Sequence, residues 1–249
     1  MTVDEKRYSC AHVVPIEQEP RHHLVIENEF VRAFVVEIAP HDRTLCHHHP
    51  HDYLLYVAGD GDIVSAARDE EPKKLSYRDA ECELLQAGMV HVVENLGDTA
   101  FRNVVVELLP GTGSLRRGAN PTLIAGGDEW VQPVQETKVQ QLFEDECAAI
   151  FNIQIEPGAK VEISGPAVVA TPYENKLGPD ALDHIEIKAN PICDLAWIPP
   201  EREAILWGCW QETERVIIFQ VGRNDEQGVA VLKERDPVRS LRAHADESE

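Results

Sequence analysis

The chain has 249 residues, of which 43% are hydrophobic, so it can bury a proper core as one large domain or as two of ordinary size. Its formal net charge is −21 at pH 7, and an acidic surface repels nucleic-acid phosphates and anionic lipid headgroups. The composition therefore indicates a globular protein and argues against nucleic acid or a membrane as its partner.

The cysteines and the first residues indicate a protein that keeps its thiols reduced. The first residues, MTVDEKRYSCAH, lack the apolar core of a signal peptide, and no apolar run approaches the ~20 residues of a membrane helix. No CxxC pair occurs, and the six cysteines stand singly at Cys10, Cys46, Cys82, Cys147, Cys193 and Cys209. We therefore expect free thiols in a soluble, cytoplasmic protein.

Short β-type runs dominate the first half of the chain. Residues 1–23 are mixed and polar, and Pro15 and Pro20 interrupt any helix there. From Leu24 on, runs rich in Val, Ile and Phe alternate with turn residues such as those at 59–61 and 97–98. The runs cover 24–38, 53–58, 62–67, 73–77, 82–86, 91–95 and 101–109. Their length and spacing predict the strands of an all-β barrel or sandwich.

The second half repeats the first in outline. Residues 148–170 resemble 31–53 when Pro157 is laid on Pro40, an offset of 157 − 40 = 117. Residues 195–222 resemble 82–111 when Val216 is laid on Val104, an offset of 216 − 104 = 112. These offsets indicate an internal duplication. We expect a first domain over 1–110, a Gly- and Pro-rich linker over 111–135, a second domain over 136–232 and a polar tail over 233–249.

A histidine cluster precedes the apolar run 53–58. The stretch from Leu45 to Gly61 reads LCHHHPHDYLLYVAGDG. Side chains alternate between the two faces of a strand, so His47 and His49 point one way and His48 the other. His91, in GMVHVVEN, lies 91 − 49 = 42 positions after this pair and is the candidate third ligand. Three neutral imidazoles with open coordination positions suit one divalent transition metal, without choosing among Fe, Mn, Zn, Ni, Co and Cu.

At these residues the chain resembles the cupins. Their first motif has the form G(x)5HxH(x)3–4E(x)6G, and His47 and His49 match its HxH pair. Their second motif has the form G(x)5PxG(x)2H(x)3N, and Gly88, His91 and Asn95 match its Gly, His and Asn with the same spacing. The resemblance covers 24–111 well and 139–222 weakly. It implies a bicupin of two jelly-roll β-barrel domains, the first metal-binding and the second degenerate.

The chain also departs from the cupin motifs. His41 stands at the leading Gly of the first motif, Gln86 stands at the Pro of the second, and the Glu position holds no glutamate. Tyr53 shares strand parity with the HxH pair, whereas Asp52 is the nearest carboxylate and has the opposite parity unless Pro50 resets the strand. Either residue is a candidate catalytic group. We favour a three-histidine core, with Tyr53 as a proton donor, hydrogen-bond donor or weak ligand.

Other residues are expected to lie outside the site. The positions of the second half that align with the three histidines are Ser164, Pro166 and Glu203, so we expect no metal in that domain. We expect His22 and His23 at the surface. Cys46 has the parity opposite to His47 and is expected to pack in the outer core.

The expected function follows from the resemblance, since cupins include dioxygenases, isomerases, decarboxylases and lyases. We expect a metal-dependent enzyme that acts on a small, anionic metabolite, leaning to dioxygenase-type chemistry. The alternatives are an isomerase or lyase of a sugar or hydroxy acid, in which Tyr53 or Asp52 moves protons, and a non-catalytic cupin that binds a metal or a small ligand. Barrel domains often pair their exposed edge strands, so a homodimer is one expected form of the protein.

Overall fold

The computed structural model describes residues 8, 10–124, 137–172, 177, 181–208 and 213–223. The tail 233–249 and residues 125–135 of the expected linker lie outside the described residues. The fold is all-β, as predicted. Among the described residues there is no helix of the length and apolar character that crossing a membrane requires.

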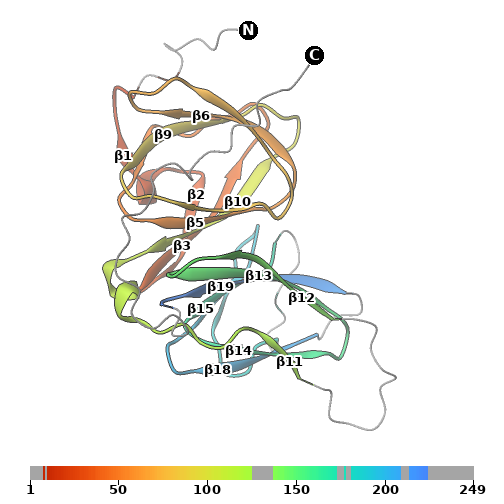
Figure 1. The fold of residues 1–249 in the computed structure, drawn as a ribbon. Coiled ribbons are helices and arrows are strands. Elements are labelled where there is room, and N and C mark those ends of the chain that lie inside the picture. The colour runs from red at the N-terminus through yellow and green to blue at the C-terminus, as the bar shows by residue number, and fades with distance from the viewer. Residues whose placement is uncertain are drawn as a thin grey trace, which may run out of the picture.

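The first ten strands form two five-stranded sheets, with the orders β1-β4-β9-β6-β7 and β2-β3-β10-β5-β8. These two sheets enclose the first barrel, which is the upper half of Figure 1. The strands are β1 Val14–Pro15, β2 His22–Glu27, β3 Val31–Ile38, β4 His47–His49, β5 Tyr53–Val57, β6 Gly61–Ala67, β7 Lys73–Tyr77, β8 Cys82–Leu85, β9 Met89–Asn95 and β10 Phe101–Leu108. Two 3-10 turns, η2 Ile16–Gln18 and η3 Pro110–Ser114, complete this half.

The later strands form the second barrel, drawn from green to blue in Figure 1. Its sheets have the orders β11-β14-β18 and β12-β13-β19-β15-β17-β16. The strands are β11 Thr122–Ile124, β12 Lys138–Glu144, β13 Ala148–Ile155, β14 Lys160–Ser164, β15 Ala167–Ala170, β16 Ile187–Lys188, β17 Leu195–Ile198, β18 Glu203–Trp207 and β19 Glu214–Val221. Among the described strands, no sheet combines members of both halves.

Equivalent strands of the two barrels start at nearly constant offsets along the chain, as the internal repeat predicted. β3 and β13 both have eight residues and start 148 − 31 = 117 positions apart. β10 and β19 start 214 − 101 = 113 positions apart, one more than the alignment of Val216 on Val104 gave. His47 of β4 pairs with His91 of β9 in the first barrel, and Ser164 of β14 pairs with Glu203 of β18 in the second. The aligned positions of the two halves are thus structurally equivalent.

The strands at the junction of the barrels are apolar on both faces. On β3, Phe34 and Val36 face the interior of the first barrel, whereas Ala33 and Val35 belong to a cluster that also contains Ile217 and Phe219 of β19. This explains the continuous apolar run of β3, since a strand buried on both faces needs no polar alternation. The barrels are therefore joined by a shared hydrophobic layer, where β3, β5 and β10 lie beside β13, β15 and β19 (Figure 1).

The expectation that all cysteines are free thiols is wrong for two of them. Cys10 and Cys46 form a disulfide, while Cys82 is a free thiol and Cys209 lies outside the described residues. The reason is that β1 runs parallel to β4, with Val14 donating its backbone N–H to the Cys46 carbonyl at 2.9 Å, which brings the preceding segment against Cys46. Cys46 is buried, as its parity predicted. The cytoplasmic location stays a prediction.

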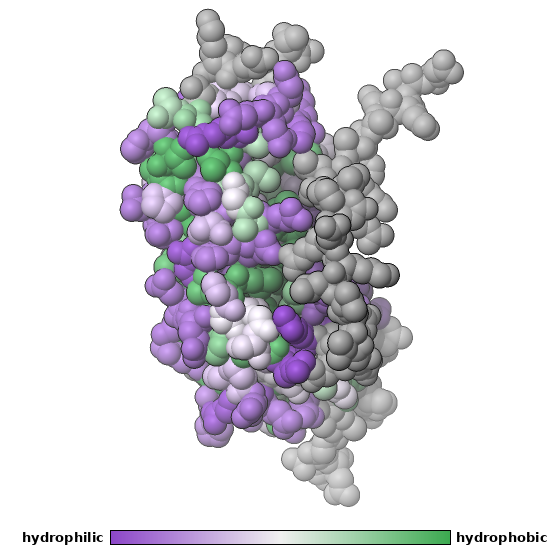
Figure 2. All heavy atoms as spheres, turned by 60° about the vertical axis from the view of Figure 1, so that its left-hand side comes forward, coloured by the Kyte–Doolittle hydropathy of each residue, from purple (hydrophilic) through white to green (hydrophobic). Residues whose placement is uncertain are grey.

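The surface is mainly hydrophilic on the face drawn in Figure 2, in keeping with the net charge of −21. Apolar side chains gather there in two areas, one over the first barrel and one near the middle of the molecule. The expected homodimer also stays a prediction.

Candidate metal centre

Three predicted histidines converge inside the first barrel. Because His47 and His49 share a face of β4, and His91 lies opposite His47 on β9, their three rings lie side by side, with centroids 4.6 to 5.3 Å apart. The Nε2 atom of His47 lies 3.1 Å from that of His49 and 3.1 Å from that of His91. The side chains are buried, with exposed fractions of 0%, 1% and 8% in the order of the sequence.

His22 joins this group, contrary to the expectation that it lies at the surface. It pairs with Val36 across β2 and β3, which places its ring inside the barrel with only 8% of the residue exposed. Its ring centroid is 4.6 Å from that of His47 and 5.9 Å from that of His49. One potential ligand atom from each of these three residues lies within 4.8 Å of the others. His23, the next residue, is exposed as predicted.

The outer ring nitrogens of two histidines contact polar groups of the barrel wall. His47 Nδ1 lies 2.9 Å from the carbonyl oxygen of Leu45, and His91 Nδ1 lies 3.3 Å from Ser65 Oγ. A carbonyl can only accept, so the Nδ1 of His47 carries the proton and its Nε2 presents a lone pair. Contacts of this kind orient metal-binding histidines and fix their tautomer.

Carboxylates face the outer nitrogens of the other two histidines. His22 Nδ1 lies 2.8 Å from Glu19 Oε2, and His49 Nδ1 lies 3.8 Å from Glu107 Oε1. Glu107 is fully buried and accepts hydrogen bonds from the Arg32 guanidinium, the shorter at 2.5 Å. Carboxylate–histidine pairs raise the basicity of the ring nitrogen that faces a metal.

The barrel interior keeps the imidazoles of His47, His49 and His91 neutral. Burial, with a smaller contribution from the neighbouring His22, lowers the pKa of His47 to about 4. Burial, followed by the neighbouring histidines, also holds the pKa of His49 and of His91 well below the usual value. Neutral imidazoles are the form that binds metals. Two nitrogens that bind one ion at right angles at ~2.1 Å lie about 3 Å apart, so this histidine group can hold a divalent transition metal.

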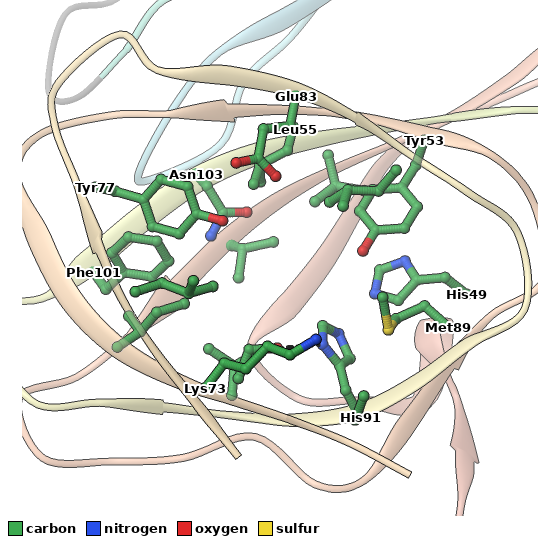
Figure 3. A pocket seen from close by; sticks show the side chains of 18 of the residues that line it. His49, Tyr53, Leu55, Lys73, Tyr77, Glu83, Met89, His91, Phe101 and Asn103 are labelled. Atoms are coloured by element: carbon green, nitrogen blue, oxygen red, sulfur yellow. Dashed lines mark hydrogen bonds between the residues drawn. The ribbon is translucent and has the colours of Figure 1, made fainter. Parts of the chain in front are cut away.

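A cavity of about 170 Å³ extends from the histidines through the first barrel, and side chains from both sheets line it (Figure 3). Tyr53 lines it and stacks on His49, with ring centroids 4.1 Å apart and an angle of 18°. Its hydroxyl points toward the histidine end (Figure 3). Burial is the largest cause that raises the pKa of Tyr53, so this phenol stays protonated.

Asp52 does not share this position. It is absent from the cavity wall, and its Oδ1 instead accepts a hydrogen bond from the Ala87 backbone N–H at 2.8 Å. The strand parity that favoured Tyr53 therefore holds, since β5 begins at Tyr53 and Pro50 does not reset it. A catalytic role of Asp52 stays a prediction.

The second barrel has a different interior at the equivalent positions. Ser164 is half-buried and Glu203 is exposed, and Pro166 follows a cis peptide bond. The interior is filled by aliphatic and aromatic side chains such as Phe151, Ile163 and Ile218. Among the described residues, the ligand atoms that lie close enough together to hold one metal ion belong to His22, His47 and His49 of the first barrel, and His91 lies beside His47.

Comparison with known proteins establishes the fold. No family model matches the chain, and no curated protein matches it in sequence. Among solved structures, AerE from Microcystis aeruginosa is 14% identical, with a TM-score of 0.50, and the match covers 82% of this chain and 98% of AerE. A vicilin from Solanum melongena is 13% identical, with a TM-score of 0.51, and the match covers 78% of this chain and 75% of the vicilin.

A salicylate 1,2-dioxygenase from Pseudaminobacter salicylatoxidans is 10% identical, with a TM-score of 0.47, and the match covers 78% of this chain and 71% of that one. At such identities the matches to AerE and the vicilin show the fold alone and say nothing of the chemistry. The arrangement of the strands, the duplicated barrels and these two matches agree, and the chain has a cupin-type fold with two barrels in one chain.

Proposed function

We propose that the first barrel is the active site of a metal-dependent enzyme that acts on a small, anionic metabolite, leaning to dioxygenase-type chemistry. The observation that carries the proposal is the convergence of three buried Nε2 atoms, joined by two separations of 3.1 Å, at one end of a cavity. His47, His49 and His91 would hold one divalent ion, with His22 as a fourth ligand. When bound, such an ion supplies Lewis acidity and, if it is iron, the capacity to activate dioxygen.

The charge balance of the site supports an anionic substrate. The imidazoles of His47, His49 and His91 are neutral ligands and leave the charge of a divalent ion uncompensated, and the nearby Glu107 is engaged by Arg32. Lys73 also lines the cavity, but its amine is paired with Glu70 at 2.7 Å and adds no free positive charge. The vicilin from Solanum melongena has different anionic ligands in structurally similar pockets, so this fold can accommodate anions.

Tyr53 is the chain's own candidate for moving a proton. Its hydroxyl has no recorded hydrogen-bond partner among the residues that the structure describes, and it opens onto the cavity beside His49. A protonated phenol at this place can donate a hydrogen bond, or a proton, to an oxygen of a substrate bound at the histidines. The same position favours a second candidate function, an isomerase or lyase of a sugar or hydroxy acid, in which Tyr53 would transfer the proton.

The metal test compares two histidines of the same strand pair. We expect the purified protein to hold about one equivalent of metal, and His91→Ala to lose it, because a ligand is removed from a buried site. His48→Ala is the matched control, since His48 lies on β4 with the opposite parity and should leave the metal content unchanged. Full metal content in His91→Ala, measured by mass spectrometry of the ashed protein, would overturn the site.

Oxygen consumption separates the candidate functions. Stoichiometric iron, with oxygen uptake when candidate anionic substrates are added, supports the dioxygenase-type reaction. Zinc or nickel, with turnover that needs no oxygen and is lost in Tyr53→Phe, supports the isomerase or lyase. Binding of metal and ligand without turnover of any candidate would argue for a non-catalytic cupin.

A further inference from the structure

The end of the cavity away from the histidines carries an unpaired amide. Asn103 lies on β10 with only 7% of the residue exposed, and its amide points into the cavity (Figure 3). No hydrogen bond of this side chain is recorded among the described residues. Buried amides are nearly always hydrogen-bonded, because a buried polar group without a partner destabilises the folded protein. An amide left open to a cavity is therefore placed for a ligand.

The sheet register fixes how far this amide lies from the histidines. His22, Val36 and Asn103 stand directly opposite one another on the neighbouring strands β2, β3 and β10. Adjacent strands are about 4.8 Å apart, so the backbone of Asn103 lies roughly 10 Å from that of His22. After both side chains are allowed for, this distance suits a small molecule that touches the histidine end and the amide together.

Two further polar groups share the amide's end of the cavity. Tyr77 is buried, and its hydroxyl points toward Asn103 in Figure 3. Glu83 stands on β8 beside Leu55 and lines the same cavity, and burial is the largest cause that raises its pKa. The surroundings of these groups are apolar, with Val105 and Phe101 in the same wall. A carboxyl group at this end disfavours a second anionic group of a ligand.

We infer that Asn103, together with Tyr77 and Glu83, is a recognition site for a neutral hydroxyl group at the end of the substrate opposite its anionic end. A hydroxyl can donate to the Asn103 or Glu83 oxygen and accept from the Asn103 or Tyr77 donor, which satisfies all three groups. The substrate class is thus a small monoanion with an apolar body and a hydroxyl at its far end. The assignment of the anionic end rests on the proposed function.

Four commercial acids test the inference: benzoate, 3-hydroxybenzoate, 4-hydroxybenzoate and the dianion terephthalate. Their dissociation constants are measured by calorimetry, with the protein in its metal-loaded and metal-free forms. We expect one of the hydroxybenzoates to bind about three- to tenfold more tightly than benzoate, and terephthalate to bind more weakly than benzoate. Equal binding of benzoate and both hydroxybenzoates, or no binding of any acid, would overturn the inference.

Variants then assign the preference to Asn103. Asn103→Leu should remove the preference for the hydroxyl while leaving benzoate binding within about twofold. Val36→Leu is the control, because Val36 lines the same wall one strand away and has no polar group. If Asn103→Leu fails to fold, Tyr77→Phe provides the second measurement, and a smaller loss of the same preference is expected. A preference that persists in both variants would overturn the inference.

The two proposals fail separately. If the protein holds no metal but the metal-free form shows the Asn103-dependent preference, the metal function fails and the recognition site stands. If metal binds and the preference is absent, the recognition site fails and the metal function stands.

Discussion

The two barrels use one topology for different purposes. At equivalent positions of the paired strands, the first barrel has His47 opposite His91 and the second has Ser164 opposite Glu203. The first barrel surrounds a cavity with polar groups at both ends, whereas the second is filled with aliphatic and aromatic side chains. The same fold can thus contain either a binding site or a packed core. The few inward-facing residues at the ends of β4 and β9 determine which of the two is formed.

The second barrel has a structural role that its packing explains. Its strands β13, β15 and β19 cover the outer face of β3, β5 and β10, and the two sets share one hydrophobic layer. Phe30 stacks on Trp197 across this junction, with ring centroids 6.2 Å apart. Trp197 is partly buried and packs against this shared layer. A cut in the linker would therefore expose a large apolar surface on both fragments.

Among the changes that test the difference between the barrels, removal of the disulfide in the first barrel should have the largest effect on the free energy of unfolding. Cys10 and Cys46 close a loop with a sequence separation of 36, and a loop of this length contributes about 4 kcal/mol in the chain-entropy model. Cys46→Ser should lower the free energy of unfolding in urea by an amount of this order. Reductant should destabilise the wild type similarly and leave the variant unchanged.

Cys82→Ser is the control for this change, because Cys82 is a free thiol of the same barrel. A peptide map under non-reducing conditions checks the link directly. If Cys10 and Cys46 are recovered as separate free thiols from the folded protein, the prediction is wrong.

A smaller effect should distinguish the two interiors. Ile163 is fully buried in the packed core of the second barrel, whereas Ile63 lines the cavity of the first. Removing a buried isoleucine side chain to alanine costs about 2–5 kcal/mol, and the cost rises with the void that is left. We expect Ile163→Ala to lower the free energy of unfolding by about 3 kcal/mol and Ile63→Ala to lower it by about half as much. The smaller effect is expected because the side chain of Ile63 already borders the cavity. Equal losses in urea unfolding would show that the first interior is packed as tightly as the second.

Local patterns were sufficient for the fold and for part of the candidate site. The β-type runs, the turn residues between them and the repeat gave an all-β chain of two barrels. Strand parity placed His47 and His49 on one face, and the same rule separated Tyr53 from Asp52. These features depend on alternation within one strand, which a sequence displays directly.

Features that depend on which strands become neighbours could not be read in this way. His22 enters the site because β2 lies beside β3, and the register of this pair shifts between Leu24 and Ile26, which breaks the parity of β2. The partner of Cys46 comes from a segment without periodicity. Asn103 carries no motif, and its isolation becomes visible only when the cavity beside it is known. A polar residue within the apolar run 101–109 was the available signal for it.

The smallest predicted effect concerns the contact between the barrels. Arg215 of β19 binds both carboxylate oxygens of Asp79, at 2.5 and 2.9 Å, and also contacts the Tyr56 hydroxyl. The hydrogen bond from Arg215 is the main cause that lowers the pKa of Asp79. Because 40% of the Asp79 side chain is exposed, solvent screens the ion pair. Asp79→Asn should therefore lower the free energy of unfolding by only about 1 kcal/mol at pH 7.

The pH dependence of this difference follows from the lowered pKa of Asp79 in the folded state. A group of this kind adds stability above its unfolded pKa of about 4 and loses it as the pH falls through the folded pKa. The difference in the free energy of unfolding between the wild type and Asp79→Asn, measured in urea, should therefore be constant from pH 7 to 5. This gap should disappear below about pH 4. Glu186→Gln, which breaks a more exposed pair within the second barrel, should show a smaller gap throughout. A gap for Asp79→Asn that widens as the pH falls would contradict the assignment, because it would mean that protonated Asp79 stabilises the junction better than its ion pair with Arg215.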